Sequence, residues 1–259
     1  MKVDLQLCNP KIPGGCGVGG VADLNGKPSR DIIAMSLEAC VRLEHRGGHI
    51  ADTGDGCGVL LQVCRPFFEQ FLPRRLIPDP DSPLVVGTFF FPPGEQTNAR
   101  GLQPEIDRFF RRCGLKPLMW RKVPIQYKVL GASANQSRPE IWHALLSQGI
   151  VPKERLPLVL FQVKNSIERE FRKIYTASLS ADTIVYKALA TSIQFAELYP
   201  DLLDPSMESA LCLFHRRYST NTFSSWELAQ VFRYLAQNGE INSIKANRLP
   251  LLTFKVNSA

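Results

Sequence analysis

Residues 175–187 read YTASLSADTIVYK, and this stretch decides the class of fold that the rest of the chain must fit. Residues 175–180 and 183–187 are rich in β-branched, aromatic and small residues, which is typical of strands. Only Ala181 and Asp182 separate them, and so short a connection joins antiparallel neighbours in a hairpin, although Ala-Asp is not the favoured turn chemistry. Hairpins do not fit an all-parallel doubly wound sheet. The stretch therefore predicts antiparallel sheets covered by helices.

Strand and helix signals alternate along the chain outward from this hairpin. The apolar run of residues 84–91, closed by Pro92-Pro93, predicts a buried strand. Ser29 is the expected N-cap of a helix that Gly47-Gly48 stops. We expect further strands at residues 18–23, 59–63, 158–163 and 211–216, and helices at residues 30–45, 105–112, 138–146, 167–172 and 191–198.

The composition is that of an ordinary globular protein, with 259 residues, 44% hydrophobic and 21% charged, enough for one large domain or two small ones. The net charge of +7 is spread along the chain, so we expect no nucleic-acid partner. No run reaches the ~18 apolar residues of a membrane span, and residues 1–15 lack the apolar stretch of a secretory signal. The seven cysteines include no C-x-x-C pair, so we expect mostly buried free thiols and no metal site. Free thiols indicate a reducing, cytoplasmic compartment. Because no apolar run is long enough for a span, we also expect no membrane partner.

Four glycine-associated or polar stretches are candidates for chemistry, because glycine lets the backbone approach a ligand. They are CGVGG from Cys16, LEHRGGHIADTGDGCG from Leu43, HRRYSTNTFSSW from His215 and LAQNGEIN from Leu235. No convincing strand precedes the first stretch, and no Gly-Lys-Ser/Thr occurs, so nucleotide binding is disfavoured. Taken alone, each key residue has a plainer explanation: a packed thiol for Cys16, a surface arginine for Arg217 and a turn for Asn238-Gly239.

Together, in this order and at this spacing, the four stretches resemble the N-terminal glutaminase domain of the glutamate synthase large subunit. The likeness runs from about Cys16 to Arg248, and STNTF, LAQ and NGEIN are its most specific parts. The resemblance implies a class II glutamine amidotransferase of the N-terminal-nucleophile hydrolase type. Its fold would be α+β, a four-layer αββα sandwich of two antiparallel sheets. The family's domain continues past the position of residue 259, so the resemblance also implies a sandwich that is incomplete at its C-terminus.

The resemblance places the family's nucleophile at Cys16. Residues 1–15 would be a propeptide, and residues 16–259 would be the N-terminal portion of the amidotransferase domain. Once Cys16 is the first residue, its α-amino group, with a pKa of about 7.7–8.0, can act as base toward its own thiol. The oxyanion hole falls on Asn238, through its side-chain amide, and on Gly239, through its backbone N–H.

The resemblance also gives the substrate's α-carboxylate an arginine partner, Arg217, since a guanidinium binds a carboxylate through two parallel hydrogen bonds. Adjacent residues of a strand face opposite sides, so Arg216 is expected to point outward or toward a different layer and to tolerate lysine. Weaker candidates for lining the pocket are Thr220 and Asn221. The positions expected to give structural support rather than chemistry are Arg46 and Asp55.

The resemblance implies that the domain hydrolyses L-glutamine and supplies ammonia to a glutamate synthase reaction, an oxidoreductase step of nitrogen assimilation. Its partners would be the central and FMN domains of glutamate synthase or a separate synthase chain. No cofactor is expected in this domain, and FMN and an iron–sulfur cluster would belong to the synthase domains. The family's acidic residue for the substrate's α-amino group has no counterpart before the chain ends. A second hypothesis is therefore a non-catalytic truncated module that needs a partner chain or has lost activity.

Overall fold

The computed structural model describes residues 16–50, 52–93, 99–216 and 224–235. Within these ranges the strands form two four-stranded antiparallel sheets and a short ribbon of β2 (His49–Ile50) and β3 (Thr53–Gly54). The first sheet has the order β1 (Gly17–Ala22), β10 (Leu211–Arg216), β4 (Cys57–Gln62) and β9 (Thr183–Ala188). The second sheet has the order β6 (Lys116–Lys122), β7 (Glu140–Ser147), β5 (Leu84–Phe91) and β8 (Tyr175–Ser180).

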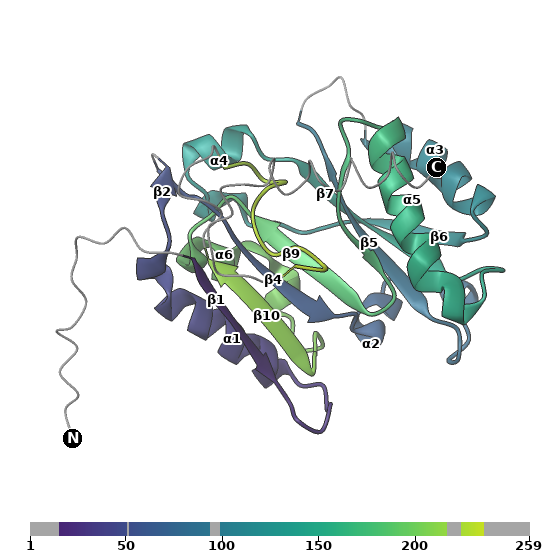
Figure 1. The fold of residues 1–259 in the computed structure, drawn as a ribbon, viewed down its shortest axis with the longest axis horizontal. Coiled ribbons are helices and arrows are strands. Elements are labelled where there is room, and N and C mark those ends of the chain that lie inside the picture. The colour runs from purple at the N-terminus through teal and green to yellow at the C-terminus, as the bar shows by residue number, and fades with distance from the viewer. Residues whose placement is uncertain (1–15, 51, 94–98, 217–223, 236–259) are drawn as a thin grey trace, which may run out of the picture.

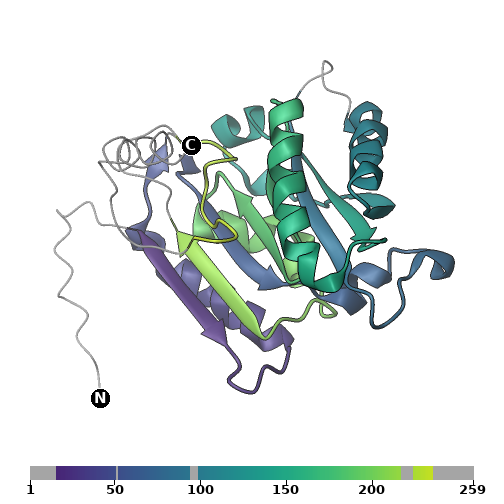
Figure 2. The ribbon, with the colours of Figure 1, turned by 45° about the vertical axis from the view of Figure 1, so that its right-hand side comes forward.

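Helices cover the outer faces of the two sheets, which gives the four layers seen in Figures 1 and 2. The first sheet carries α1 (Arg30–Arg42), which packs on β1 and β10, and α6 (Ser192–Leu198) beside it. The second sheet carries α3 (Ala99–Arg112) and α5 (Leu156–Glu170). Shorter helices are η1 (Glu44–Arg46), α2 (Arg65–Glu69), η2 (Arg74–Leu76), η3 (Tyr127–Val129), α4 (Ala132–Gln136), η4 (Lys153–Arg155) and α7 (Pro200–Leu203). This arrangement confirms the expected α+β fold with two antiparallel sheets.

The hydrophobic core lies at two levels, and β5 belongs to both. Val86 and Phe90 pack between the two sheets, whereas Val85 and Phe89 pack toward α3 and α5. Every residue of β5 is buried, because one of its faces meets the other sheet and the opposite face meets the helices. A strand covered on both faces has no alternation of polar and apolar residues. The buried strand predicted at residues 84–91 is confirmed with its exact bounds.

Several predicted boundaries are also confirmed. Ser29, in extended backbone, immediately precedes α1. Thr191 begins α6 with a capping box: its hydroxyl accepts from the backbone N–H of Gln194 at 3.1 Å, and the Gln194 side chain accepts from the Thr191 N–H at 3.0 Å. The strand predicted at residues 211–216 is β10. No helix in the described ranges combines the length and the apolar character needed to cross a membrane.

Two predicted elements are wrong in type. The helix expected at residues 138–146 is strand β7, which lies between β6 and β5 and is almost entirely buried. Alanine and leucine favour helices in isolation, but pairing on both edges overrides that preference. The strand expected at residues 158–163 is part of helix α5. The buried residues of α5 follow a helical spacing: Leu156, Leu160, Val163 and Ile167.

The hairpin expected at residues 175–187 does not form, although both of its strands do. β8 belongs to the second sheet and β9 to the first, so Ala181-Asp182 carries the chain from one sheet to the other. The hydroxyl of Ser180 accepts from the backbone N–H groups of Asp182 at 3.0 Å and Thr183 at 3.2 Å, which supplies the turn with side-chain rather than ladder hydrogen bonds. The two strands face each other across the core instead of pairing edge to edge.

Candidate active site

The structure describes Cys16, Arg46 and Asp55 among the residues that the resemblance selects. The remaining candidates lie outside the described residues: Arg217, Thr220, Asn221, Asn238 and Gly239. Of the described cysteines, Cys40, Cys57, Cys64 and Cys212 are buried free thiols, and Cys16 and Cys113 are partly exposed. Among the described residues, no three His, Cys, Asp or Glu side chains are grouped so that they could bind a metal ion.

Cys16 lies directly before β1, at one end of the first sheet. Its neighbour Gly17 packs closely against Arg46 of η1 and against Leu43, the residue directly before η1. A Cβ atom added at Gly17 would lie 3.2 Å from the Cβ of Leu43 and 3.5 Å from the Cβ of Arg46. The small residue after the cysteine thus allows the start of β1 to approach the helix–loop corner that carries Arg46.

One row of residues crosses the first sheet at this end: Gly17 in β1, Arg216 in β10, Cys57 in β4 and Ala188 in β9. The same row lies next to Cys16, next to the point where the chain leaves β10 for residues 217–223, and next to the Asp55-Gly56 loop. The row faces α1, because the Sγ atoms of Cys57 and Cys40 are 3.4 Å apart and Cys40 belongs to α1. Three of the four glycine-associated stretches therefore meet at one end of one sheet.

The Arg216 side chain is fully buried at the centre of this row, with 0% of its surface exposed. It uses all five of its N–H donors. Nε and Nη2 bind the two carboxylate oxygens of Glu44 at 2.9 and 2.8 Å, and Nη1 binds Oδ1 of Asp55 at 2.7 Å. The remaining donors bind the backbone oxygens of Gly48 and Gly56, each at 3.1 Å. Arg216 thus joins the end of β10 to the loop of residues 44–56.

Glu44 extends this network to α6. Its Oε2 atom accepts from the backbone N–H of Ser192 at 2.7 Å and also from the Ser192 hydroxyl. Burial disfavours the ionised form of Glu44, but the hydrogen bonds from Arg216 and Ser192 outweigh burial and lower the pKa of the carboxyl group. Burial likewise opposes the charge of Arg216, but its bonds to Glu44 outweigh that cost and raise the pKa of the guanidinium. Both groups are therefore charged over the neutral pH range.

Asp55 closes the loop that Arg216 holds. Its Oδ1 atom accepts from the backbone N–H of Gly48 at 3.1 Å, and its own backbone N–H donates to the oxygen of Gly48 at 3.1 Å. A Cβ atom added at Gly47 would overlap the guanidinium of Arg216. Glycine at this position lets the loop lie directly on that guanidinium.

The expectation that Arg216 tolerates lysine does not agree with these contacts. Arg216 does not point outward: its side chain lies inside the protein, where it makes five hydrogen bonds. A lysine has only three donors, all on a single nitrogen. Glu44 was not selected by sequence reasoning. It is 172 residues from Arg216 in the chain, and no local pattern reports so distant an ion pair.

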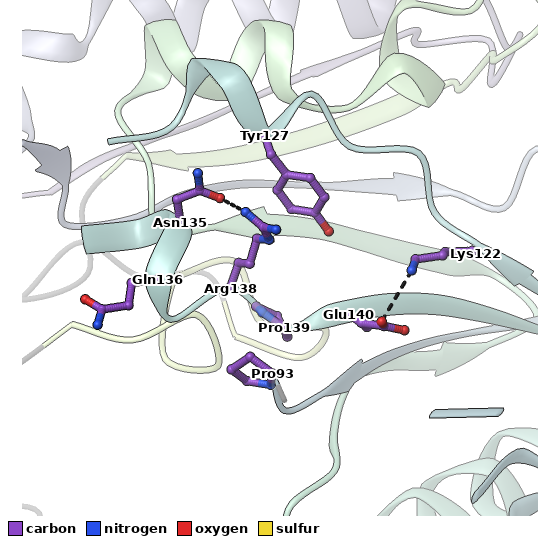
Figure 3. A pocket seen from close by; sticks show the side chains of 8 residues that line it. All are labelled: Pro93, Lys122, Tyr127, Asn135, Gln136, Arg138, Pro139 and Glu140. Carbon is purple, nitrogen blue, oxygen red and sulfur yellow. Dashed lines mark hydrogen bonds and ion pairs between the residues drawn. The ribbon is translucent and has the colours of Figure 1, made fainter. Parts of the chain in front are cut away.

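A separate cavity of about 300 Å³ lies between α4 and the start of β7 (Figure 3). Its charged groups are already paired within the cavity wall: Lys122 with Glu140 at 3.4 Å, and Arg138 with the side-chain oxygen of Asn135. The Arg138 guanidinium also lies over the ring of Tyr127, 4.3 Å from its centre. Cys16, Arg46 and Asp55 are not among the residues that line this cavity.

Comparison with known proteins gives a consistent result. The family model described as class-II glutamine amidotransferases matches residues 16–251. The chain is 38% identical over 240 residues to the NADPH glutamate synthase large chain of Azospirillum brasilense, and 36% identical over 240 residues to that of Bacillus subtilis. It is 35% identical over 250 residues to the NADH glutamate synthase of Saccharomyces cerevisiae.

Each of these alignments covers 90% of the chain but only 16%, 16% and 12% of the three relatives, respectively. The chain therefore spans a small fraction of the length of these synthases. The family match begins at Cys16, the residue directly before β1, and it extends over most of the chain. The protein belongs to the class-II glutamine amidotransferases, a family of enzymes.

Proposed function

We propose that this chain is a glutaminase domain, which hydrolyses L-glutamine to glutamate and ammonia with Cys16 as the nucleophile. The observation that carries the proposal is the position of Cys16. It is a partly exposed cysteine directly before β1, at the sheet end where the Arg216 network fixes the surrounding loop. Membership of the amidotransferase family supports this role for it.

The proposed reaction requires removal of residues 1–15, so that Cys16 carries a free α-amino group. With a pKa of about 7.7–8.0, a fraction of this amine is neutral at pH 7 and takes the proton of the thiol. The thiolate attacks the side-chain amide carbon of glutamine, and the resulting oxyanion would be stabilised by Asn238 and Gly239. Ammonia leaves, and water then hydrolyses the thioester to glutamate.

Specificity for glutamine would come from Arg217, which follows the end of β10. Arg216 occupies the α1 side of the first sheet, and if the alternation of β10 continued by one residue, Arg217 would face the inter-sheet side. There a guanidinium would bind the substrate's α-carboxylate through two hydrogen bonds, with Thr220 and Asn221 lining the same pocket. Arg46 and Asp55 would support the loop rather than take part in chemistry.

The ammonia would pass to a glutamate synthase reaction, because the relatives are glutamate synthases and the chain matches a small part of each. The synthase domains, or a separate synthase chain, would be the partner, in the cytoplasm. Any FMN and iron–sulfur cluster would belong to those domains, and the proposed glutaminase step uses only groups of this chain and water.

The test combines the mass of the mature N-terminus with an assay for glutamine hydrolysis in the intact protein. We expect a chain that begins at Cys16, with activity that Cys16→Ala abolishes. Cys113→Ala is the matched control, because Cys113 is also partly exposed but lies in the turn between α3 and β6, away from the first sheet. It should keep full activity. A retained Met1 together with no glutamine hydrolysis would overturn the proposal and favour a non-catalytic module.

A further inference from the structure

Arg138 is a half-buried cation in the wall of the cavity between α4 and the start of β7 (Figure 3). It lies in the short connection between these two elements, directly before Pro139. Its Nη1 atom donates to the side-chain oxygen of Asn135, and its guanidinium carbon lies 4.3 Å from the ring centre of Tyr127. The amide and the ring restrain the guanidinium, and neither of them carries a negative charge.

The charge of Arg138 is not balanced in the way that the charges of two more deeply buried arginines are. Arg121 binds both carboxylate oxygens of Asp201, at 2.7 and 2.6 Å, and Arg216 binds both carboxylate oxygens of Glu44. In the described part of the chain, no carboxylate forms an ion pair with Arg138. A guanidinium has five N–H donors, and Arg138 uses one of them within the cavity wall. The others are available for an anion.

Lys122, the last residue of β6, supplies a second cation to the cavity wall. Its Nζ atom lies 3.4 Å from Oε1 of Glu140, and the two side chains are 52% and 47% exposed. Exposed ion pairs contribute little, so this pair does not commit Lys122 to Glu140. Glu140 has a further partner, because its Oε2 atom accepts from the indole N–H of Trp142 at 3.1 Å. The lining residues therefore carry two positive charges and one negative charge, which favours an anionic ligand.

The form of the cavity indicates an elongated anion. In Figure 3 the Arg138 guanidinium and the Lys122 ammonium lie on different sides of the Tyr127 hydroxyl. Pro93 and Pro139 also line the cavity and supply apolar surface for a carbon chain. The volume of about 300 Å³ is at the lower end of the range for small-molecule sites. An anion with a charged group at each end can use both cations and the apolar surface, whereas a compact ion cannot use that surface.

We propose that this cavity binds a small dicarboxylate, with one carboxylate on the free donors of Arg138 and the other on Lys122. The planar guanidinium suits a carboxylate, because the two groups can form two parallel hydrogen bonds. Asn135 and Tyr127 already order the arginine side chain, which lowers the entropic cost of binding. The residues that line the cavity take no part in the proposed glutaminase reaction, so this inference does not rest on the proposed function.

The test is isothermal titration calorimetry of the intact protein with glutarate, a five-carbon dicarboxylate, at low ionic strength. We expect a dissociation constant on the order of 1 mM. Arg138→Gln should weaken binding about 10–100-fold, because the charge-assisted hydrogen bonds are lost. Arg138→Lys, which keeps the charge but not the planar fork, should weaken it about 3–10-fold, and it replaces Arg138→Gln if that variant does not fold. Arg112→Gln is the matched control: Arg112 also lies over an aromatic ring, 5.6 Å from the centre of Phe109, but on α3, so binding should not change.

Nuclear magnetic resonance of the indole N–H groups provides a readout at the cavity itself. Glutarate that draws Lys122 away from Glu140 should shift the Trp142 signal, because that indole donates to Glu140. The Trp120 signal should move much less, since its N–H donates to Asp107 of α3 at 2.8 Å. Valerate, a five-carbon monocarboxylate, and inorganic phosphate are the comparison anions. Each should bind at least about tenfold more weakly than glutarate, because neither can use both cations and the apolar surface.

No glutarate binding at about 20 mM would overturn the inference, and so would unchanged binding in folded Arg138→Gln protein. Equal affinity for valerate or phosphate would also overturn it, because the site would then not select a dicarboxylate. Glutarate that binds near Cys16 instead would leave the Trp142 signal in place and would not respond to Arg138→Gln, which counts against the inference as well. If the protein does not hydrolyse glutamine, the proposed function fails, while the calorimetry still decides whether the cavity binds a dicarboxylate.

Discussion

Arg216 and Glu44, 172 residues apart in the chain, form a two-point ion pair in which Nε and Nη2 each bind one carboxylate oxygen, at 2.9 and 2.8 Å. The guanidinium is fully buried, and Asp55 holds it from another side at 2.7 Å. This pair connects the last residue of β10 to η1, next to the start of β1. The geometry around Cys16 therefore depends on contacts between parts of the chain that lie far apart in sequence.

The first prediction concerns Arg216→Lys. A lysine cannot replace five donors in a planar arrangement, so some of the buried oxygens of Glu44, Asp55, Gly48 and Gly56 would lose their partners. We expect the free energy of unfolding, measured by urea denaturation, to fall by about 2–4 kcal/mol. Arg42→Lys is the control, because Arg42 and Glu38 form an exposed pair one helical turn apart, worth less than about 0.5 kcal/mol. Equal stability of the two variants would refute the importance of the network.

The second prediction concerns the pH dependence of Glu44. Its pKa is lowered in the folded state, so its contribution is complete above the unfolded-state pKa near 4.5 and is lost as the pH falls through the lower folded-state pKa. The unmodified protein should therefore be more stable than Glu44→Gln at pH 7, and the difference should shrink progressively below about pH 4.5. Unfolding free energies at pH 7, 5, 4 and 3 provide the measurement. A difference that stays constant over this range would show that the charge of Glu44 is not what matters.

The third prediction concerns Gly47→Ala. The backbone of Gly47, with φ of −84° and ψ of 164°, suits any residue, so the cost must come from the overlap of the new methyl group with the Arg216 guanidinium. In the otherwise unmodified protein, we expect Gly47→Ala to lower the free energy of unfolding, measured by urea denaturation, by about 1–3 kcal/mol. In an Arg216→Lys background the overlap disappears, and the loss should fall below about 0.5 kcal/mol. Additive losses in this double-mutant cycle would contradict the contact.

The fourth prediction concerns cysteine reactivity. A diazo-ketone analogue of glutamine should label Cys16 far faster than Cys113, although both thiols are partly exposed, because only Cys16 is proposed to lie in a glutamine pocket. Burial raises the pKa of Cys113, which lowers its reactivity further. Peptide mass mapping after limited labelling is the measurement, and excess glutamine should protect Cys16. Similar labelling rates at Cys16 and Cys113 would indicate that Cys16 is a packed thiol without a catalytic role.

Sequence reasoning succeeded where the signal is local. The N-cap at Ser29, the helix that starts at Thr191 and the fully apolar run of β5 each depend on residues within a few positions of one another. It failed at β7, because a strand buried on both faces has no alternation of polar and apolar residues. It also failed at α5, because the exposed Leu158 and Phe161 interrupt the helical spacing of apolar and polar residues. The unfavourable Ala181-Asp182 turn chemistry was itself a sign that β8 and β9 do not form a hairpin.

The site shows the same division. Cys16 and Asp55 stand in glycine-rich stretches that sequence alone singles out. The contacts of Arg216 could not be foreseen, because they join segments that no short pattern connects: Arg216 of β10 binds Glu44 of η1. The available signal was an arginine that closely follows the apolar run Leu211–Phe214.

The pairing of β1 with β10 also determines when this end of the molecule can be assembled. Gly17 pairs with Arg216, about 200 residues later in the chain. At roughly 5–20 residues per second, a ribosome takes on the order of 10–40 s to make the intervening polypeptide, and β1 has no access to this partner during that time. A nascent strand that waits so long is exposed to mispairing with other chains, and glycine lowers that hazard because it is a poor strand former. The run Gly17-Val18-Gly19-Gly20 therefore suits a strand that must remain unpaired until the ribosome has synthesised β10.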